Sequence, residues 1–261
     1  MEIDVHCITP DEELFSQIRE NSASCKRWAK SVEAHDGVAV IVGGGPSMRS
    51  RLDAIKYRQK EGQTIFALNG AATFLNKNGV FPDYQVLLDS QPFLTDYIGP
   101  ARDYLIASQC HPDVFKAVSN PILWHLAVEG AEAQIPEYDT DFCLVGGGIT
   151  VGLSSLCLVY ALGYRKIHLY GYDSSYEEGT HAYAVPEIAE DKIIHKPVAG
   201  ERVVVTIGGK KFITTLCLTK QAQDFPKLCD DLIDMGCTIT LDCDGLLWAI
   251  VQQNLIAAKA A

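Results

Sequence analysis

The sequence has no paired cysteines and no long apolar run, and each absence removes a class of protein. Its nine cysteines are scattered without a CxxC pair, whereas zinc sites show paired spacing and disulfide frameworks belong to short secreted chains. No run reaches the ~18 apolar residues of a membrane span. The first residues lack the basic and apolar regions of a signal peptide. We therefore expect free thiols, no transmembrane segment and a cytoplasmic location.

Basic residues are scarce. The chain has 22 Lys and Arg against 33 Asp and Glu, a formal net charge of -11, and no basic cluster is longer than Lys210-Lys211. Binding to nucleic acid phosphates needs a basic face, so we expect no nucleic acid partner. The 261 residues are 48% hydrophobic and 21% charged, which is typical of a folded globular protein with a sizeable core.

Short apolar runs alternate with helical patterns along the chain. The runs are continuous and rich in β-branched residues, which favours strands that are covered on both faces. Strands are predicted at 38–42, 64–68, 84–88, 104–107, 122–124, 166–170 and 238–241, and helices at about 47–60, 70–78, 111–118, 150–162 and 219–235. This alternation predicts an α/β fold with a doubly wound, mostly parallel sheet.

Three segments interrupt this pattern. Residues 1–35 are predicted as an N-terminal helical extension with Leu14, Ile18 and Trp28 as core contacts, followed by a single domain over residues 36–261. A β-hairpin is predicted within residues 202–213, centred on two glycines. The apolar segment 246–261 is expected to pack on the sheet or on a second subunit, which leaves a homo-oligomer open.

A glycine cluster follows the first predicted strand and opens a helix: Gly43, Gly44, Gly45, Pro46 and Ser47. Free backbone N–H groups at a helix N-terminus favour an anion, and ligands bind at the carboxyl ends of parallel strands. The cluster has neither the lysine of a P-loop nor a GxGxxG pattern. It therefore predicts contact with a ligand, and the alternative is a tight turn without one.

Polar residues follow the next strands as well. Asn69 and Gly70 come after the second strand, Asp89 after the third, and Asp173 after the strand at 166–170. Carboxylate oxygens are preferred ligands of Mg²⁺, so Asp89 and Asp173 are candidate metal ligands. Each carboxylate is equally able to cap the following helix.

A second glycine cluster is expected to form the other wall of the same cleft. It contains Gly148 and Gly152 and precedes an apolar helix, with Thr150 near the N-cap. Neither glycine cluster contains Lys or Arg. Phosphate recognition is therefore expected to come from backbone amides and helix N-termini.

The loop over 172–183 is polar and aromatic, as functional loops on α/β scaffolds often are. His181 is a candidate general acid or base near neutral pH, and Tyr176 and Tyr183 are candidates to hydrogen-bond or stack on a nucleotide. Considered alone, a loop histidine is more often an ordinary surface residue.

The order of these motifs resembles one superfamily over residues 38–247. The segments that carry the resemblance are Ile-Val-Gly-Gly-Gly-Pro-Ser-Met at 41–48, Phe-Ala-Leu-Asn-Gly-Ala at 66–71, Phe-Pro-Asp-Tyr-Gln-Val-Leu-Leu-Asp at 81–89, Gly-Ile-Thr-Val-Gly at 148–152 and the stretch 161–173. The superfamily includes the 6-hydroxymethylpterin diphosphokinase MptE-like proteins, the motility accessory factors that glycosylate flagellin, and more distantly the bacterial sialyltransferases.

The resemblance implies a Rossmann-like fold that binds a nucleotide, either ATP or a cytidine-monophosphate sugar. Residues 43–47 and Asn69 would hold phosphate and ribose, Thr150 and Gly152 would line the donor pocket, and His181 would be the base. The diphosphokinases carry Asp-Leu-Asp-Gly after the third strand. Here Asp89 is followed by Ser-Gln-Pro, so one carboxylate is missing.

The leading hypothesis is a nucleotide-dependent transferase that takes a sugar from a CMP-type nucleotide-sugar, with catalytic roles for His181, Asp173 and Asp89. One alternative is a Mg²⁺-dependent pyrophosphokinase of the MptE-like type, and a second is a nucleotide-binding protein without turnover. The expected ligand is a nucleotide or nucleotide-sugar, with Mg²⁺ on Asp89 or Asp173. The sequence does not identify the acceptor.

Overall fold

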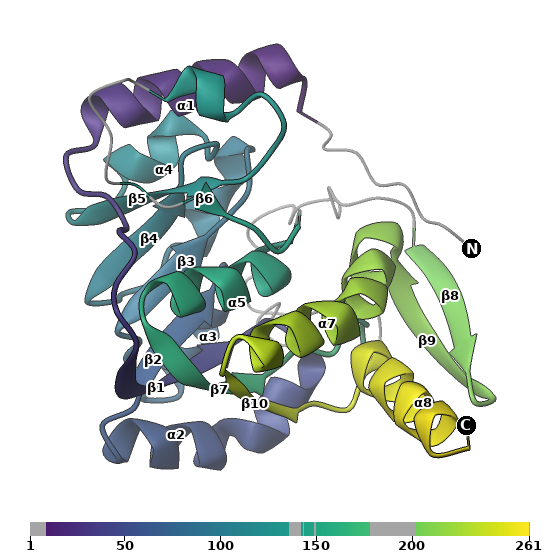
Figure 1. Cartoon of the computed structure of the whole chain (residues 1–261). Coiled ribbons are helices and arrows are strands. Elements are labelled where there is room, and N and C mark those ends of the chain that lie inside the picture. The colour runs from purple at the N-terminus through teal and green to yellow at the C-terminus, as the bar shows by residue number, and fades with distance from the viewer. Residues whose placement is uncertain (1–8, 136–141, 143, 149, 178–201, 261) are drawn as a thin grey trace.

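The computed structural model describes residues 9–135, 142, 144–148, 150–177 and 202–260. Within these ranges the chain forms an eight-stranded sheet covered by helices on both faces (Figure 1). The strands are β1 (His35–Val42), β2 (Thr64–Leu68), β3 (Tyr84–Leu87), β4 (Asp103–Ala107), β5 (Pro121–Leu126), β6 (Leu144–Val145), β7 (Tyr164–Tyr170) and β10 (Thr238–Asp242).

All paired strands of this sheet are parallel, in the order β10-β7-β1-β2-β3-β4-β5-β6. The chain therefore builds the sheet outward from β1 in one direction as far as β6 and then continues on the other side of β1. This order confirms the predicted α/β fold with a doubly wound sheet. Every predicted strand is present, and β6, a two-residue strand, was not predicted.

Alternating side chains of β1 pack on opposite helical layers. Val40 and Val42 belong to a cluster with residues of η1 (Pro46–Arg51), α2 (Leu52–Lys60) and α3 (Ala71–Lys77). Ala39 and Ile41 point into the larger cluster, where α5 (Val151–Ala161) and α7 (Leu216–Asp234) cover the opposite face. Burial on both faces explains why the strands are continuous apolar runs.

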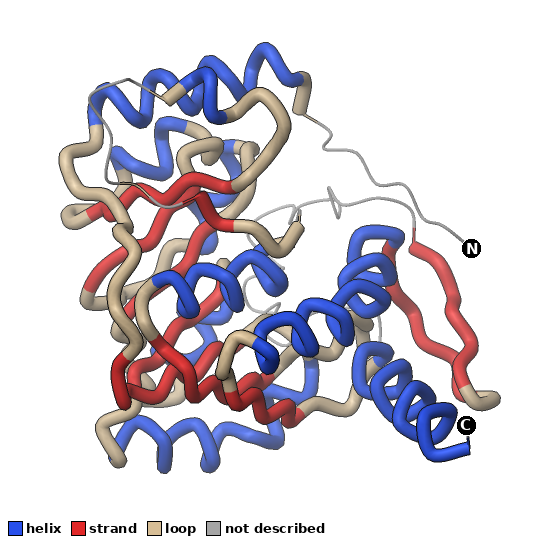
Figure 2. The backbone as a smooth tube through the Cα atoms, viewed as in Figure 1, coloured by secondary structure: helices blue, strands red, loops and turns tan. Residues whose placement is uncertain are grey.

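The smaller elements lie around this framework. Helix α4 (Pro112–Lys116) and the short 3-10 helices η2 (Pro92–Tyr97) and η3 (Glu132–Gln134) connect the strands on the β6 side. The predicted hairpin consists of β8 (Arg202–Ile207) and β9 (Lys210–Thr215), an antiparallel pair that is separate from the main sheet (Figure 2). Helix α8 (Leu246–Ala260) follows β10, and Leu246 and Leu247 in its first turn are fully buried in the larger cluster.

The N-terminal helix is shorter than expected. Helix α1 spans Asp11–Ser24 and buries Leu14 and Ile18 as predicted. From residue 25 the chain is extended, because Arg27 and Ala29 form backbone hydrogen bonds with Leu123 of β5 at 2.8 Å. Trp28 therefore packs on the core from a bridge to a strand and not from a helix. Among the described residues, no helix has the length and apolar character needed to cross a membrane.

Phe66 lies at the centre of the sheet, and we expect its truncation to be costly. Its ring is fully buried, stacks on Tyr84 with ring centroids 5.0 Å apart, and meets Tyr164 edge-on at 5.4 Å. Phe66→Ala should lower the free energy of unfolding by about 3–5 kcal/mol. Phe81→Ala, at a side chain that is 53% exposed, should change it by less than about 0.5 kcal/mol. Urea unfolding of both variants measures the difference, and equal losses would contradict it.

Candidate functional site

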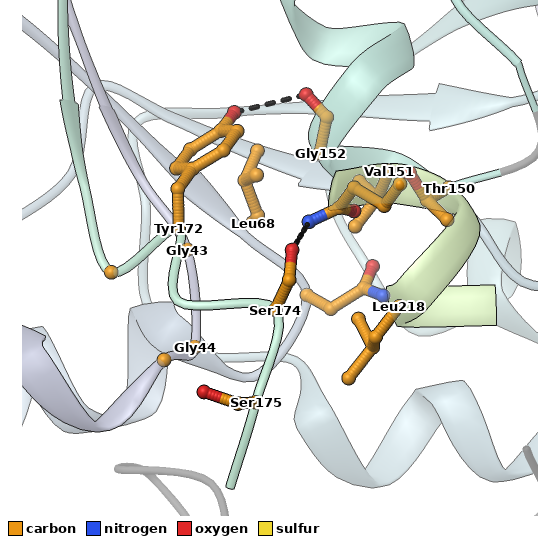
Figure 3. A pocket seen from close by; sticks show the side chains of 14 residues that line it. Gly43, Gly44, Leu68, Thr150, Val151, Gly152, Tyr172, Ser174, Ser175 and Leu218 are labelled. Carbon is orange, nitrogen blue, oxygen red and sulfur yellow. Dashed lines mark hydrogen bonds between the residues drawn. The ribbon is translucent and has the colours of Figure 1, made fainter. Parts of the chain in front are cut away.

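A pocket lies at the carboxyl ends of β1 and β7, the two neighbouring strands from which the chain leaves in opposite directions. Such a switch point is where open α/β sheets bind ligands. The enclosed volume is about 180 Å³, below the ~300–1,000 Å³ typical of small-molecule pockets. The pocket that the described residues form is therefore large enough for part of a nucleotide. They are Gly43, Gly44, Gly45, Leu68, Asn69, Thr150, Val151, Gly152, Gly171, Tyr172, Ser174, Ser175, Leu218 and Gln221 (Figure 3).

The pocket brings together six of the predicted nucleotide-binding residues: Gly43, Gly44, Gly45, Asn69, Thr150 and Gly152. Other predicted residues do not line it, namely Pro46, Ser47, Gly70, Gly148, Tyr176, Asp89 and Asp173. His181 and Tyr183 lie outside the described residues. None of the lining residues is Lys, Arg, Asp or Glu, so the described part of the pocket offers only neutral hydrogen-bonding groups.

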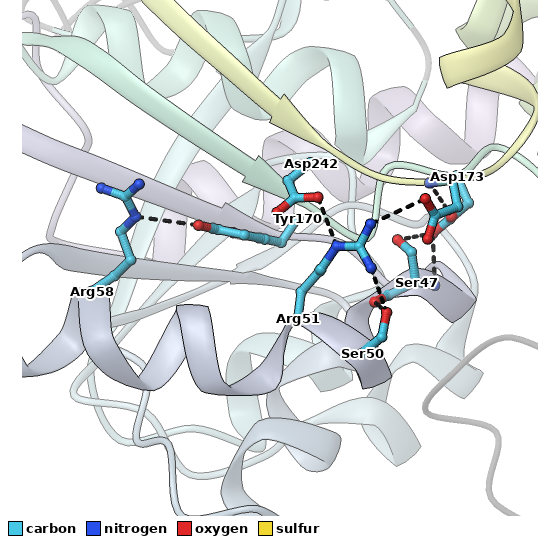
Figure 4. A network of polar contacts seen from close by, with 8 residues as sticks. Ser47, Ser50, Arg51, Arg58, Tyr170, Asp173 and Asp242 are labelled. Carbon is cyan, nitrogen blue, oxygen red and sulfur yellow. Dashed lines mark hydrogen bonds and ion pairs between the residues drawn. The ribbon is translucent and has the colours of Figure 1, made fainter.

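The Asp173 carboxylate joins three loops beneath the pocket (Figure 4). Its Oδ2 accepts hydrogen bonds from the Ser47 hydroxyl at 2.8 Å and the Ser47 N–H at 3.2 Å, and its Oδ1 accepts from the Asp244 N–H at 3.2 Å. These residues follow β7, β1 and β10. Burial raises the pKa of the Asp173 carboxyl above its ordinary value, while the bonds from Ser47 and Asp244 act in the opposite direction. These hydrogen bonds go to η1, which lies earlier in the chain, and to Asp244, so they confirm neither the predicted cap of the following helix nor the predicted metal ligand.

The first glycine loop uses most of its own N–H groups internally. Gly43 and Gly45 donate to carbonyls at the end of β7 at 2.8 and 2.9 Å, Ser47 donates to the carboxylate described above, and Pro46 has no N–H. Among the described residues no acceptor is present for the Gly44 N–H. The N-terminus of η1 is therefore occupied by a carboxylate of the chain itself, and the loop offers at most one donor to a ligand.

Close approach between the loops explains two glycines of this segment. A Cβ on Gly43 would lie 2.6 Å from the Gly171 carbonyl oxygen. A Cβ on Gly45 would overlap the Asp173 carboxylate. Both positions thus need glycine for packing of β1 against β7, whatever they contact in a ligand.

The second glycine loop provides the better anion site. Thr150 caps α5, and its hydroxyl accepts from the Leu153 N–H at 3.3 Å. The N–H groups of Val151 and Gly152 have no acceptor within the helix, as is usual at a helix start, and both residues line the pocket. The positive end of the α5 dipole therefore faces the cavity.

Tyr172 fixes this helix end against β7. Its hydroxyl donates to the Gly152 carbonyl at 3.0 Å and lies 2.9 Å from the Ser155 hydroxyl. Burial raises the pKa of the Tyr172 phenol, so this hydroxyl stays protonated at neutral pH. Sequence reasoning placed Tyr172 in a functional loop without assigning it a role. Its contact with Gly152 could not be read from the sequence, because 20 positions separate the two residues.

Backbone strain is concentrated at the same pocket. Among the described non-glycine residues only Asn69 (φ 42°) and Ser174 (φ 51°) have positive φ, and both line the pocket. Such conformations persist where the surroundings determine them, often at ligand sites. Ser174 is held by Gln221 of α7, whose amide donates to its hydroxyl at 2.9 Å. Sequence reasoning missed Ser174 and Gln221, although a glutamine in the apolar face of α7 was a signal.

Asp89 lies elsewhere on the carboxyl edge. The ends of β3 and β7 are three strands apart, roughly 14 Å at a spacing of about 4.8 Å between strands, so the strand order does not favour one ion shared by Asp89 and Asp173. The Asp89 Oδ1 accepts from the Gln91 N–H at 3.0 Å, and burial raises the pKa of its carboxyl. Within the described ranges, no three His, Cys, Asp or Glu side chains form a group suited to a metal.

Tyr176 points to the hairpin and not to the pocket. Its N–H donates to the Ile213 carbonyl at 2.8 Å, and the Arg202 guanidinium lies 5.5 Å from the centre of its ring. The predicted stacking of Tyr176 on a nucleotide therefore has no support from the position of its ring.

The family model of the 6-hydroxymethylpterin diphosphokinase MptE-like proteins matches residues 13–179, more than half of the 261 residues. The chain belongs to this family. The match includes both glycine loops, Asn69 and Asp173, and it confirms the resemblance inferred from the motif order. No curated protein matches the sequence.

The MptE-like chain is also similar to a solved structure, the MAf glycosyltransferase from Magnetospirillum magneticum AMB-1. The TM-score is 0.65 at 16% sequence identity, and the match covers 96% of this chain and 42% of the other. At this identity the similarity shows a shared fold. This MptE-like chain spans less than half the length of that structural neighbour.

Two matched glycine substitutions test the packing of the first loop. Gly45→Ala should destabilise the fold by about 1–3 kcal/mol, since the added methyl overlaps the Asp173 carboxylate and forces the loops apart. Gly146→Ala adds the same methyl where no atom lies within 4 Å, so its effect should stay below about 1 kcal/mol. Thermal and urea unfolding measure both, and a Gly45→Ala variant as stable as Gly146→Ala would refute the close contact.

The raised pKa of the Asp89 carboxyl predicts how the stability of the protein changes with pH. The folded chain holds this proton more tightly than the unfolded chain, so the wild type loses stability as pH rises from about 4 through the raised pKa. Asn at this position stays neutral and keeps the acceptor for Gln91. Asp89→Asn should therefore gain stability relative to wild type between about pH 4 and about pH 7.

Urea unfolding at the two pH values measures this gain. Asp230→Asn, at an exposed position of α7, is the matched control for the change in charge and should not show this gain. If added Mg²⁺ stabilises the wild type but not Asp89→Asn, then Asp89 binds the metal, as the sequence hypothesis holds.

Proposed function

We propose that this MptE-like chain is a nucleotide-dependent transferase whose donor is a nucleotide-sugar of the CMP type. The family and the structural neighbour support a transferase-type function. The observation that carries the proposal is the pocket at the switch point, where the N-terminus of α5 faces the first glycine loop. A phosphate is the ligand group that this arrangement suits best.

The nucleotide would lie with its phosphate at Val151 and Gly152 and its ribose towards Asn69. Asn69 uses its side-chain oxygen to accept from the Leu88 N–H at 3.2 Å, so its amide nitrogen is available to a ligand hydroxyl or phosphate. In a bound donor, the acceptor oxygen would form a bond to the anomeric carbon while the bond from that carbon to the phosphate oxygen breaks. His181 would take the acceptor's proton, a role that rests on the sequence resemblance alone.

The runner-up is a Mg²⁺-dependent pyrophosphokinase, which the description of the matching family favours. The two functions differ in donor and in metal dependence. A kinase should bind ATP only with a divalent cation, whereas the proposed transferase should bind a CMP-type donor without one. A chain that binds nucleotide but transfers nothing would support the third hypothesis, a non-catalytic nucleotide-binding protein.

Calorimetry with CMP-, UDP- and GDP-sugars and with ATP, each with and without Mg²⁺, tests the proposal. Asn69→Asp should weaken binding by about tenfold or more, because it places a negative charge in the pocket that would hold the anionic nucleotide. The variant keeps the acceptor for Leu88, and aspartate tolerates positive φ as asparagine does. Its thermal stability should therefore change little.

The matched control is Asn120→Asp, an exposed position just before β5 and hence at the opposite edge of the sheet. It makes the same change in net charge and should leave the Kd unchanged. Equal weakening in both variants would mean that the nucleotide is not bound beside Asn69. Failure of every CMP-, UDP- and GDP-sugar to bind would overturn the proposed function.

A further inference from the structure

A glutamine lies at the centre of β3, where an apolar residue is expected. Gln85 is fully buried in a parallel strand that is covered on both faces. A buried amide costs free energy unless its polar atoms are paired. Departures from the local pattern of this kind are most frequent near functional sites.

The three side-chain hydrogen bonds of Gln85 go to backbone groups outside the sheet. Its Nε2 donates to the carbonyls of Asn69 at 2.7 Å and Tyr97 at 2.8 Å, and its Oε1 accepts from the Gly99 N–H at 3.1 Å. Because two partners are carbonyls and the third is an N–H, the orientation of the amide is fixed by its surroundings.

One of these partners is the strained pocket residue. Asn69 has φ 42°, its N–H donates to the Val86 carbonyl at 2.9 Å, and its side-chain oxygen accepts from Leu88. The hydrogen bond from the Gln85 amide holds the Asn69 carbonyl, which is the remaining polar group of the Asn69 backbone. All three bonds come from β3 or its carboxyl end, and a left-handed conformation persists only where its neighbours determine it in this way.

We propose that Gln85 is a positioning residue that holds Asn69 in the conformation that faces the pocket, and thereby sets the affinity of the site for a nucleotide. This inference rests on the proposed function and deepens it. The competing explanation is that Gln85 merely ties residues 97–99 to β3. That explanation predicts a loss of stability without a specific loss of binding.

Gln85→Met keeps the size of the side chain and removes all three hydrogen bonds. The Kd of the best-binding nucleotide of the panel, measured well below the melting temperature, should rise about tenfold, because Asn69 then spends less time in the competent conformation. Gln17→Met is the matched control. Gln17 is a buried glutamine of α1 that donates to the Ser90 carbonyl at 3.2 Å, outside the pocket. The Kd of the Gln17→Met variant for the same nucleotide should therefore stay at the wild-type value.

A double-mutant cycle decides whether Gln85 acts through Asn69. Glycine adopts positive φ without support, so in an Asn69→Gly background the backbone no longer needs Gln85. There Gln85→Met should change the Kd by about twofold or less. An unchanged Kd in Gln85→Met alone, or the same tenfold loss in the Asn69→Gly background, would overturn the proposal.

Amide hydrogen exchange tests the positioning without any ligand. Gln85→Met should speed exchange at Asn69 and Leu88 and leave the Gly45 N–H, which is bonded to Gly171, at the wild-type rate. If no nucleotide binds the wild type, the proposed function fails, and exchange alone then decides whether Gln85 orders Asn69. If exchange speeds up equally at all of these amides, or does not change, the positioning role of Gln85 is refuted.

If Gln85→Met does not fold, Gln85→Glu replaces it in both measurements. Glutamate keeps the volume and the acceptor for Gly99 but loses the amide donor to Asn69. It should weaken nucleotide binding and speed exchange in the same direction. Wild-type affinity and exchange in Gln85→Glu would overturn the proposal.

Discussion

The carboxylate of Asp173 is the constraint on which the site depends. It lies 3% exposed after β7 and accepts hydrogen bonds from the loops after β1 and β10. Arg51 of η1 reinforces the same junction, since its guanidinium contacts Asp242 at 2.6 Å and Asp244 at 3.0 Å. The loops after β1, β7 and β10 are thereby held in one arrangement before any ligand arrives.

These hydrogen bonds make the second glycine loop, and not the first, the better candidate for binding an anion. The first resembles an anion-binding turn, yet a carboxylate of the chain takes the place of the anion at the start of η1. A ligand phosphate at that point would compete with a buried negative charge. Among the described residues, no carboxylate caps the start of α5 at Val151 and Gly152, so the dipole of α5 is available to a ligand there.

The sequence predicted seven of the eight strands of the sheet and six of the fourteen residues that line the pocket. Continuous β-branched runs identified the strands because strands of this kind are buried on both faces. Strand ends with glycine or asparagine identified Gly43 and Asn69, and a glycine cluster before an apolar helix identified Gly152. The role of Asp173 could not be decided, because its partners lie 126 and 71 positions away. Only tertiary packing separates a cap from a metal ligand.

The predicted end of the first helix was wrong, and β6 was missed, for a related reason: both depend on contacts with β5. Residues 27–29 leave the helical pattern because β5 offers them backbone hydrogen bonds. β6 is two residues long, too short for any periodicity, and exists only because β5 lies beside it.

Neutral amides hold several of the loops at the carboxyl edge. Gln85 and Gln221 hold the strained residues Asn69 and Ser174. Asn21 of α1 donates to the Ser108 and Cys110 carbonyls after β4 at 2.8 and 2.7 Å. In a chain of net charge -11, buried carboxylates at these positions would repel both one another and a phosphate ligand. Amides supply the same hydrogen bonds without that repulsion, and this allows an acidic protein to keep a pocket suited to an anion.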